Sequence, residues 1–373
     1  MVDTLTRFKD HDLVEWRDVE GIRYDEVPVR DRAGAPVAGL HAVRITLDNP
    51  GQLNSCTTGM VKGVILGMRR ASNDRAAVAV VFTGSGSARS APAATPPSAP
   101  ECTPATRRNA RRYMRLFNDM VTAILHCDKP VICRVNGMRI AGGQEIGMAC
   151  DFSVAQDLAV FGQAGPRHGS APDGGSTDFL PLFVGIERAM ESCTLCEPWS
   201  AHRALHYGLL TRVVPALRVD GELVPNPLVE TSRWLDDMGQ VVYGAFRTGA
   251  ARDEGKALLK RGEVDLGPLD ACVDGLVTSL AMTMPGCLSK TLESVRKHKL
   301  VHWDRNRETN RAWLGLNMMN EGRAGFRAFN EGSKACREAD FLLLRRRLAE
   351  GASWGPELID EALARCHGKE ARS

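Results

Sequence analysis

The sequence predicts an α/β protein, because patterns typical of buried strands alternate with amphipathic helices along its first half. Residues 43–47 alternate as a strand does, and residues 77–83 form a short apolar, β-branched run that ends at Gly84. Between these two strands, apolar residues recur at helical spacing: Met60, Val61, Val64, Ile65 and Met68. This order of elements favours ligand-binding loops at the ends of the strands.

A second helix and strand follow. The helix has an apolar face formed by Met114, Phe117, Val121, Ile124 and Leu125. Lys129-Pro130 then introduces a predicted buried strand over residues 131–135. Together with the first strands, these elements complete a predicted core over residues 1–215.

The later part of the chain divides into two segments. From residue 214 to about 267 the pattern loosens, and Asp220-Gly221 indicates a β-hairpin. We therefore interpret residues 216–267 as an insertion. Beyond Pro268 we expect three or four amphipathic helices through Leu344, within a helical C-terminal region over 268–373.

Composition excludes several classes of protein. Of the 373 residues, 43% are apolar and 25% charged, and the net charge of +3 comes from scattered residues of both signs. We therefore expect no nucleic-acid or membrane partner, although a phosphate-bearing small ligand stays open. Residues 1–12 lack an apolar segment, and no apolar run reaches the length of a membrane span. These features predict a cytoplasmic protein.

Eleven cysteines occur without paired metal-type spacing, which favours a reducing compartment over a disulfide framework. Cys193 and Cys196 form a lone C-x-x-C. A redox or zinc role for this pair has no second pair or histidine cluster to complete it, so core cysteine is the alternative.

Residues 135–151 carry the strongest chemical signal. They begin at a predicted strand end, turn through Gly137 and enter a helix at Gly142-Gly143. The first amides of a helix lack internal partners, so the Gly142 amide is a candidate oxyanion donor, and Gly143 leaves room for a ligand. Glu145 in the same turn is a candidate catalytic carboxylate. The alternative is a glycine-rich helix start with a capping glutamate.

The wider pattern resembles the crotonase (enoyl-CoA hydratase/isomerase) superfamily. It combines Asn136-Gly137, the two glycines followed by Glu145, Asp151 and the Phe-Gly-Gln of residues 161–163. The resemblance covers residues 43–214 and resumes at 320–329. It implies a crotonase-like spiral of ββα units with a helical C-terminal region. In this family that region packs against neighbouring subunits, which usually form trimers or pairs of trimers. The resemblance also implies an acyl-CoA substrate and no metal or redox cofactor, since coenzyme A is part of the substrate.

Within this superfamily, residues 112–119, 134–139, 161–169, 176–181 and 195–200 resemble a ring-opening subgroup of anaerobic benzoyl-CoA degradation. Its members hydrate a cyclic, conjugated acyl-CoA and then break a ring C–C bond with a second water, which implies 3-hydroxypimeloyl-CoA as product. Both steps pass through a thioester enolate that the Gly142 amide would hold, with Glu145 activating water. The alternatives are a dihydroxynaphthoyl-CoA synthase, an enoyl-CoA hydratase and a non-catalytic acyl-CoA binder.

One departure from the family concerns the second carboxylate. Many crotonase hydratases carry a second glutamate two positions after Phe-Gly-Gln, where this chain has Gly165. Residues just downstream are candidates to replace that group: His168, Ser170 and Asp173. His168 equally suits a loop or phosphate-side residue, Asp173 a turn cap, and Asp178 a helix cap.

The resemblance also implies residues that contact the substrate. Gln163, Gly165 and Ser170 are expected to line the acyl site, with Gly143 beside them. Asn54 is expected near the nucleotide of coenzyme A, by its position in the family pattern alone.

Residues 88–110 read as if they were one base out of frame. The family loop after the strand ending at Gly84 resembles Cys-Thr-Gly-Gly-Asn-Thr, and shifting the reading frame across 90–96 can encode this phrase. We expect two compensating single-base insertions or deletions, in the gene or in its sequencing; a naturally divergent loop is the alternative. If the chain is made as printed, Pro92 removes an amide donor, and losing one oxyanion donor lowers rates about 100- to 1000-fold.

Overall fold

The computed structural model describes residues 15–86, 104–333 and 336–367, and a six-stranded sheet forms its centre. The strand order is β1-β2-β3-β4-β6-β9; β1 and β2 are antiparallel and the other neighbours are parallel. The bounds are β1 Ile22–Arg30, β2 Pro36–Leu47, β3 Ala77–Gly84, β4 Val131–Val135, β6 Phe152–Gln156 and β9 Arg212–Val214. The strands predicted at 43–47, 77–83 and 131–135 are confirmed.

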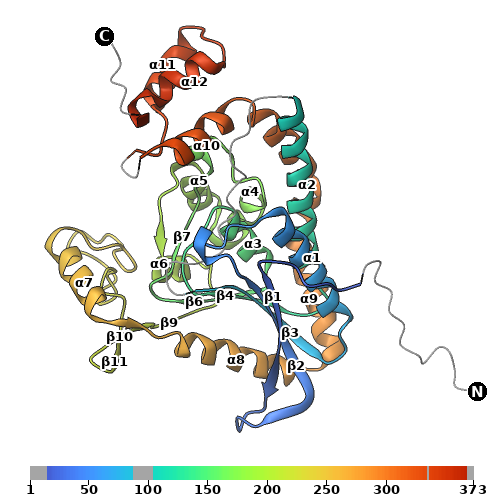
Figure 1. Ribbon diagram of the computed structural model, residues 1–373. Helices are drawn as coiled ribbons and strands as arrows, with labels where there is room; N and C mark the ends of the chain where they lie inside the picture. The colour runs from blue at the N-terminus through green and yellow to red at the C-terminus, as the bar shows by residue number, and fades with distance from the viewer. Residues whose placement is uncertain (1–14, 87–103, 334–335, 368–373) are drawn as a thin grey trace, which may run out of the picture.

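Helices cover both faces of this sheet. On one face lie α1 (Thr58–Asn73), α2 (Pro104–Leu125) and α9 (Pro285–Asn317), with α2 and α9 side by side in Figure 1. The other face carries α8 (Gly267–Ala281). Successive strand residues point to opposite faces, so Val80 joins the core under α1 and α2, whereas Val81 packs with α8. The two helices predicted before residue 126 are confirmed.

A second layer holds the elements between β4 and β9, except β6. Its short sheet, in the order β5-β7-β8, consists of β5 (Arg139–Ile140), β7 (Val160–Gly162) and β8 (Trp199–Ser200). The helices of this layer are α3 (Gly142–Ala149), α4 (Ser176–Val184), α5 (Ile186–Leu195) and α6 (Ala201–His206), and the 3-10 turn η2 spans Gly165–His168. A further turn, η1, spans Pro50–Gln52. Every residue of α3 is buried, which places its first turn inside the molecule.

The segment after β9 contains the predicted hairpin. Strands β10 (Leu217–Val219) and β11 (Glu222–Val224) are antiparallel, and β12 (Glu263–Val264) pairs with β10. Asp220 and Gly221 form the turn with φ values of 51° and 88°, a conformation typical of Asp-Gly hairpins. Helix α7 (Gly249–Arg261) precedes β12.

Five helices extend from residue 267 through the described C-terminal region. After α8 and α9 come α10 (Glu321–Glu331), α11 (Phe341–Ala349) and α12 (Pro356–Leu363), with the short turn η3 (Ala364–His367). Four of these helices, α8 to α11, begin before Leu344, as the sequence predicts, and α12 lies beyond it. Helices α10, α11 and α12 share an apolar cluster of their own, and α11 and α12 lie apart from the sheet in Figure 1.

No single helix among the described residues is long and apolar enough to cross a membrane; one bent pair, α8 with α9, passes by length and composition, with an angle of 112°.

Two cysteines of the C-terminal region are joined. Cys336 and Cys366 form a disulfide with a Cα–Cα distance of 5.0 Å, which links the start of the α11 segment to η3. The expectation of unpaired cysteines was therefore wrong for this pair, because sequence spacing gives no sign that α12 brings residue 366 back to residue 336. Cys193 and Cys196 are free thiols at the end of α5.

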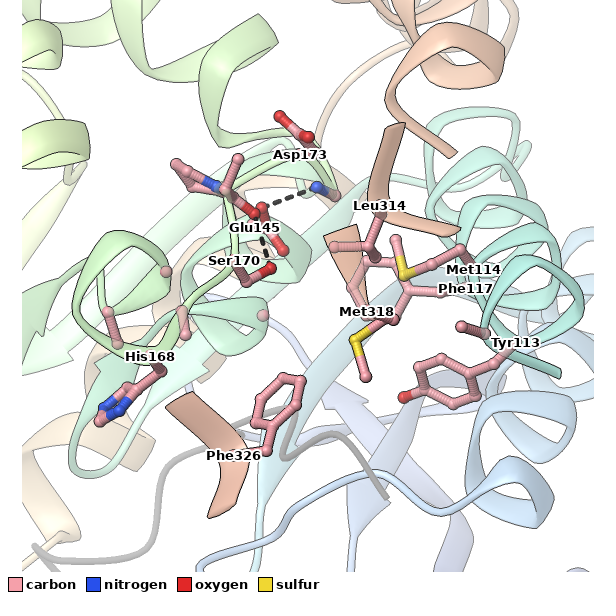
Figure 2. A pocket seen from close by; sticks show the side chains of 18 of the residues that line it. Tyr113, Met114, Phe117, Glu145, His168, Ser170, Asp173, Leu314, Met318 and Phe326 are labelled. Atoms are coloured by element: carbon pink, nitrogen blue, oxygen red, sulfur yellow. Dashed lines mark hydrogen bonds between the residues drawn. The ribbon is translucent and has the colours of Figure 1, made fainter. Parts of the chain in front are cut away.

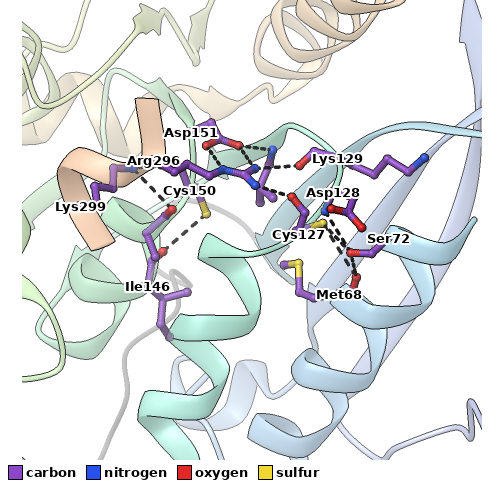
Figure 3. A network of polar contacts seen from close by, with 12 residues as sticks. Met68, Ser72, Cys127, Asp128, Lys129, Ile146, Cys150, Asp151, Arg296 and Lys299 are labelled. Carbon is purple, nitrogen blue, oxygen red and sulfur yellow. Dashed lines mark hydrogen bonds and ion pairs between the residues drawn. The ribbon is translucent and has the colours of Figure 1, made fainter. Parts of the chain in front are cut away.

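A buried ion pair fastens α9 to the sheet (Figure 3). Arg296 donates from Nε to Asp151 Oδ1 at 2.7 Å and from Nη2 to Asp151 Oδ2 at 2.5 Å. The same guanidinium donates to the carbonyls of Cys127 and Lys129, while Asp151 Oδ2 accepts from the Val131 amide at 2.8 Å. Because both side chains are buried, this pair fixes the position of α9 relative to β4.

Candidate active site

The first turn of α3 is held in place by the ends of neighbouring strands. Asn136, directly after β4, donates from Nδ2 to Gly84 O at 2.9 Å and to Gly86 O at 2.6 Å. Ala141 has φ 52° and donates its amide to Gly162 O at 3.1 Å, so the chain turns sharply and α3 begins at Gly142. The predicted helix start is confirmed. Gly142 lines a cavity of about 480 Å³, a size typical of small-molecule sites.

Glu145 lies in this cavity and is nearly inaccessible to solvent (Figure 2). Its Oε1 accepts a hydrogen bond from the Gly174 amide at 2.8 Å. Burial raises the pKa of the Glu145 carboxyl to about 8, although the amide hydrogen bond opposes this change. At neutral pH the group is therefore mainly protonated, yet close enough to ionisation to exchange a proton with a ligand.

Two glycines determine what surrounds this carboxyl. A Cβ at Gly174 would lie 2.4 Å from Glu145 Oε2, so only glycine lets the loop approach. A Cβ at Gly165 would lie 2.7 Å from Ser170 O and 3.1 Å from the carbonyl carbon of Ala171. The position two residues after Phe-Gly-Gln is thus filled by the backbone of the following loop. A two-carboxylate hydratase site is not built at this position.

The three candidates downstream of Phe-Gly-Gln, which are His168, Ser170 and Asp173, all line the cavity. Asp173 is half-buried, and burial, reinforced by the nearby Asp178 carboxyl, raises the pKa of Asp173 to about 6. Ser170 donates its hydroxyl to Ala171 O at 3.3 Å. Figure 2 shows the Asp173 carboxylate on the outer side of the loop, pointing away from Glu145.

His168 lies at the edge of the cavity and its ring points away from Glu145 (Figure 2). The ring packs edge-on against Phe329 with 5.1 Å between centroids. Burial lowers the pKa of the imidazole, so His168 is neutral at neutral pH. Gln163 also lines the cavity, and its Nε2 donates to Ser176 Oγ at 2.7 Å.

Two further expectations from the sequence concern Asn54 and residues 88–110. Asn54 is not among the residues that line the cavity; its Nδ2 donates to Ser85 O at 2.9 Å and its Oδ1 accepts from the Asn49 amide at 2.9 Å. These bonds tie the turn after β2 to the end of β3. Residues 87–103, which include most of the segment expected to be out of frame, lie outside the described residues, whereas 104–110 begin α2.

Asp178 is a buried contact of α4 with α9. Asn306 donates from Nδ2 to Asp178 Oδ1 at 2.6 Å, and burial raises the pKa of Asp178. The predicted helix-cap position is correct to the extent that Asp178 lies in the first turn of α4. Its hydrogen-bond partner, however, is a side chain of α9.

The opposite wall of the cavity was not foreseen. It is apolar and comes from α2, from α9 with the residue that follows it, and from α10. It includes Met114, Phe117, Leu314, Met318 and Phe326, with the phenol of Tyr113 among them. Nothing local in these helices distinguishes a cavity wall from ordinary core. The signal lies in their tertiary packing.

One group of metal-type ligands occurs among the described residues, away from this cavity. Ligand atoms of Glu26, His41 and Asp74 lie within 4.8 Å of one another. His41 Nε2 already pairs with Asp74 Oδ2 at 2.7 Å, and Glu26 pairs with Arg70 at 3.4 Å. This group is accounted for by ion pairs of the β1–β2 face.

Comparison with known proteins identifies the family. The enoyl-CoA hydratase/isomerase family model matches residues 40–232. The fold agrees with an enoyl-CoA hydratase from Mycobacterium avium subsp. paratuberculosis K-10 (22% identity, TM-score 0.58, covering 84% of this chain and 97% of that one). It also agrees with an enoyl-CoA hydratase/isomerase from Xanthobacter autotrophicus Py2 (21% identity, TM-score 0.59, covering 95% and 99%). The chain belongs to the enoyl-CoA hydratase/isomerase family, and its fold is the crotonase fold with a helical C-terminal region.

Three relatives that share one name are similar to this chain over most of its length. The chain is 55% identical over 355 residues to the 6-oxocyclohex-1-ene-1-carbonyl-CoA hydrolase of Thauera aromatica, covering 95% of this chain and 94% of that protein. It is 55% identical over 360 residues to the hydrolase of the same name from Geobacter metallireducens, with the same coverage. The Syntrophus aciditrophicus hydrolase of this name is 46% identical over 345 residues, covering 91% and 89%.

Proposed function

We propose that the protein hydrolyses 6-oxocyclohex-1-ene-1-carbonyl-CoA to 3-hydroxypimeloyl-CoA, as a step of benzoyl-CoA degradation. The observation that carries this proposal is the 55% identity over 95% of the chain to hydrolases of that name, and the cavity around Glu145 agrees with it. The ring-opening subgroup resemblance noted from the sequence points to the same reaction. The filled position at Gly165 argues against a two-carboxylate enoyl-CoA hydratase.

The hydration step needs one proton to move twice. Ionised Glu145 takes a proton from water, whose oxygen bonds to the ring β-carbon, and the electron pair of the double bond moves into the thioester as an enolate. The Gly142 amide, at the positive end of α3, stabilises that oxyanion. Protonated Glu145 then delivers its proton to the α-carbon, which completes the addition of water and restores the carboxylate.

Ring opening uses the same groups. Glu145 removes a proton from a second water, which attacks the ring ketone and forms a tetrahedral alkoxide. As the ketone carbon becomes a carboxyl group, the bond between it and the α-carbon breaks and its electron pair enters the thioester enolate. Protonation of the α-carbon gives the linear product. A carboxyl whose pKa lies near 8 suits both the removal and the return of the proton.

We assign the role of second acid–base group, in place of the missing second glutamate, to Asp173 rather than His168. The Asp173 pKa of about 6 leaves this carboxylate ionised when Glu145 is protonated, so the two groups hold different protonation states at neutral pH. Both side chains point away from Glu145, so orientation does not separate them; His168 differs in being neutral at neutral pH, because burial lowers its pKa. Gln163, Gly165 and Ser170, which line the cavity, are assigned to the acyl-binding wall, and Asn54 to the support of a loop near the nucleotide. Gly143 is buried in α3 and is not among the residues that line the cavity, so we assign it to the support of Gly142.

The test is turnover of 6-oxocyclohex-1-ene-1-carbonyl-CoA by the purified protein, with products separated by chromatography and identified by mass. Glu145→Gln keeps an acceptor for the Gly174 amide but cannot take a proton, so kcat is expected to fall about 100- to 10,000-fold. Asp173→Asn is expected to have a smaller effect. Glu145→Gln with wild-type kcat would contradict the assignment.

The reading frame of residues 88–110 is tested separately by resequencing the gene and by assaying the chain with that frame restored. A gene that cannot encode Cys-Thr-Gly-Gly-Asn-Thr in the other frame overturns the frameshift proposal. Activity only in the restored chain would indicate that the printed chain lacks an oxyanion donor. Binding of acyl-CoA without turnover by both forms would instead favour a non-catalytic binder.

The division of the chain and its assembly also belong to this proposal. We propose a core over 1–215, an insertion over 216–267 and a C-terminal region over 268–373 that contributes to a homotrimer or homohexamer in the cytoplasm. Mass measurement of the native protein in solution tests the assembly; a monomer would contradict it.

A further inference from the structure

Three buried side-chain atoms of the cavity have no hydrogen-bond partner in the described part of the chain: Tyr113 Oη, Gln163 Oε1 and His168 Nδ1. Gln163 Oε1 can only accept a hydrogen bond. The His168 ring points away from Glu145. Tyr113 Oη is therefore the buried, unpartnered donor of this set on the wall opposite α3.

Tyr113 occupies a distinctive place in the cavity. It projects from α2 on the apolar wall, and Figure 2 shows its hydroxyl pointing into the space beside Met318 and Phe326. A phenylalanine would fill the same wall without burying a polar atom. A buried hydroxyl without a partner costs stability, so its presence here points to an acceptor that arrives with the ligand.

The phenol is kept in its donor form. Burial raises the pKa of Tyr113, and the nearby Cys56 and Glu145 groups add to this effect because a phenolate beside them would be repelled. Tyr113 thus retains its proton throughout the working pH range. It can donate a hydrogen bond but does not act as a base.

Resting on the proposed function, we infer that the Tyr113 hydroxyl donates a hydrogen bond to the ring ketone oxygen of the cyclic acyl-CoA. This substrate has two carbonyl groups on the same α-carbon, and the amide of Gly142 is assigned to the thioester oxygen. The ketone oxygen needs a separate donor on another wall. Near Glu145, the Ser170 hydroxyl is already bonded to Ala171 O and the Gln163 amide to Ser176 Oγ.

This hydrogen bond serves both specificity and rate. When water attacks the ketone, its oxygen becomes an alkoxide, and a donor preset in an apolar wall stabilises this charge more than the neutral ketone. An ordinary enoyl-CoA has no acceptor there and would leave the hydroxyl unpaired. Tyr113 therefore favours oxo-substituted cyclic thioesters over plain enoyl thioesters.

The experiment compares Tyr113→Phe with the wild-type protein on 6-oxocyclohex-1-ene-1-carbonyl-CoA. Ring-opening kcat is expected to fall about 100- to 1000-fold, as when an oxyanion donor is removed. The inhibition constant of cyclohexane-1-carbonyl-CoA, which lacks the ketone, is expected to change less than about twofold. Tyr24→Phe is the matched control, because Tyr24 in β1 also has a buried, unpartnered hydroxyl and lies outside the cavity.

Each remaining outcome is decisive. Unchanged ring-opening kcat in Tyr113→Phe, with an active wild type, overturns this inference and leaves the proposed function intact. A parallel weakening of the ketone-free inhibitor shows that Tyr113 only shapes the wall, and also overturns it. A Tyr113→Phe protein that does not fold, while Tyr24→Phe does, contradicts the premise of an unpartnered hydroxyl. An inactive wild type contradicts the proposed function itself.

Discussion

At the scale of single residues, the proposed reaction depends most on Glu145, a carboxyl whose burial costs free energy when it is ionised. It is buried at the start of α3, against a glycine that leaves no room for a Cβ. Such burial disfavours the carboxylate and so brings the pKa into the range where one group can both accept and return a proton. The same burial makes two consequences measurable.

The first consequence concerns the pH dependence of activity. Because the reaction begins with ionised Glu145, kcat/KM is expected to rise with pH and to level off above an apparent pKa of about 8. Initial rates between about pH 6 and about pH 9.5 give this profile. A profile that is flat across this range would mean that the catalytic base is already ionised at pH 6, contrary to our assignment.

The second consequence concerns the pH dependence of stability. The folded-state pKa of Glu145, about 8, lies above its ordinary value of 4.5, so folding favours the protonated form. The stability that this group contributes is full below about pH 4.5 and is lost as pH rises to about 8. Glu145→Gln should therefore be more stable than wild type at high pH, by up to roughly 4–5 kcal/mol, and nearly equal at low pH.

Urea unfolding at about pH 5 and about pH 9 checks this prediction. Asp173→Asn serves as a comparison, since its smaller pKa shift gives a smaller pH-dependent gain. A Glu145→Gln stability difference that does not change between the two pH values would contradict the burial-raised pKa.

At the scale of elements, α9 carries one wall of the cavity and is fixed to the sheet by Arg296 and Asp151. Both partners are buried; Arg296 also bonds to the Lys129 carbonyl in the loop before β4, and Asp151 to the amide of Val131 at the start of β4. Breaking such a pair leaves one charge buried without compensation. The pair therefore determines where Leu314 and Met318 stand relative to α2.

We expect Arg296→Met to lower the free energy of unfolding by about 3–5 kcal/mol, because the Asp151 carboxylate then stays buried without its counter-charge. Lys297→Met on the same helix is the control: its pair with Glu293 is exposed and screened by solvent, so little change in the free energy of unfolding is expected. Denaturant midpoints measure both variants. Equal effects in the two variants would show that the buried pair has no special role in holding α9.

At the scale of the whole molecule, the cavity joins segments that are far apart in the sequence. The wall of the cavity formed by α3 was predictable from the sequence. Gly142, Gly143 and Glu145 lie within one turn, and the free amides at a helix start are a local property. The wall with Tyr113 and Phe326 was not predictable, since it exists only because α9 and α10 return to α2 and η2. Periodicity marks a buried helix face without saying what it faces.

The fold also has parts that the local sequence predicts and parts that it does not. Strands β2, β3 and β4 were predictable from apolar or alternating runs, whereas β1 was missed because it is a partly exposed edge strand that includes charged residues and Pro28. Asn54 was expected near the nucleotide by family position, which stays a prediction; its bonds to Asn49 and Ser85 could not be predicted from the local pattern. Contacts of this kind depend on tertiary structure, which the local pattern does not contain.

The central claim, that this site adds two waters and opens a ring, is tested most directly by turnover of 6-oxocyclohex-1-ene-1-carbonyl-CoA in ¹⁸O-labelled water. The account predicts a linear 3-hydroxypimeloyl-CoA that carries two solvent oxygens, one in the hydroxyl group and one in the new carboxylate. A product with one solvent oxygen and an intact ring would identify a hydratase and contradict the account. So would the absence of the doubly labelled product from both the printed and the frame-restored chain.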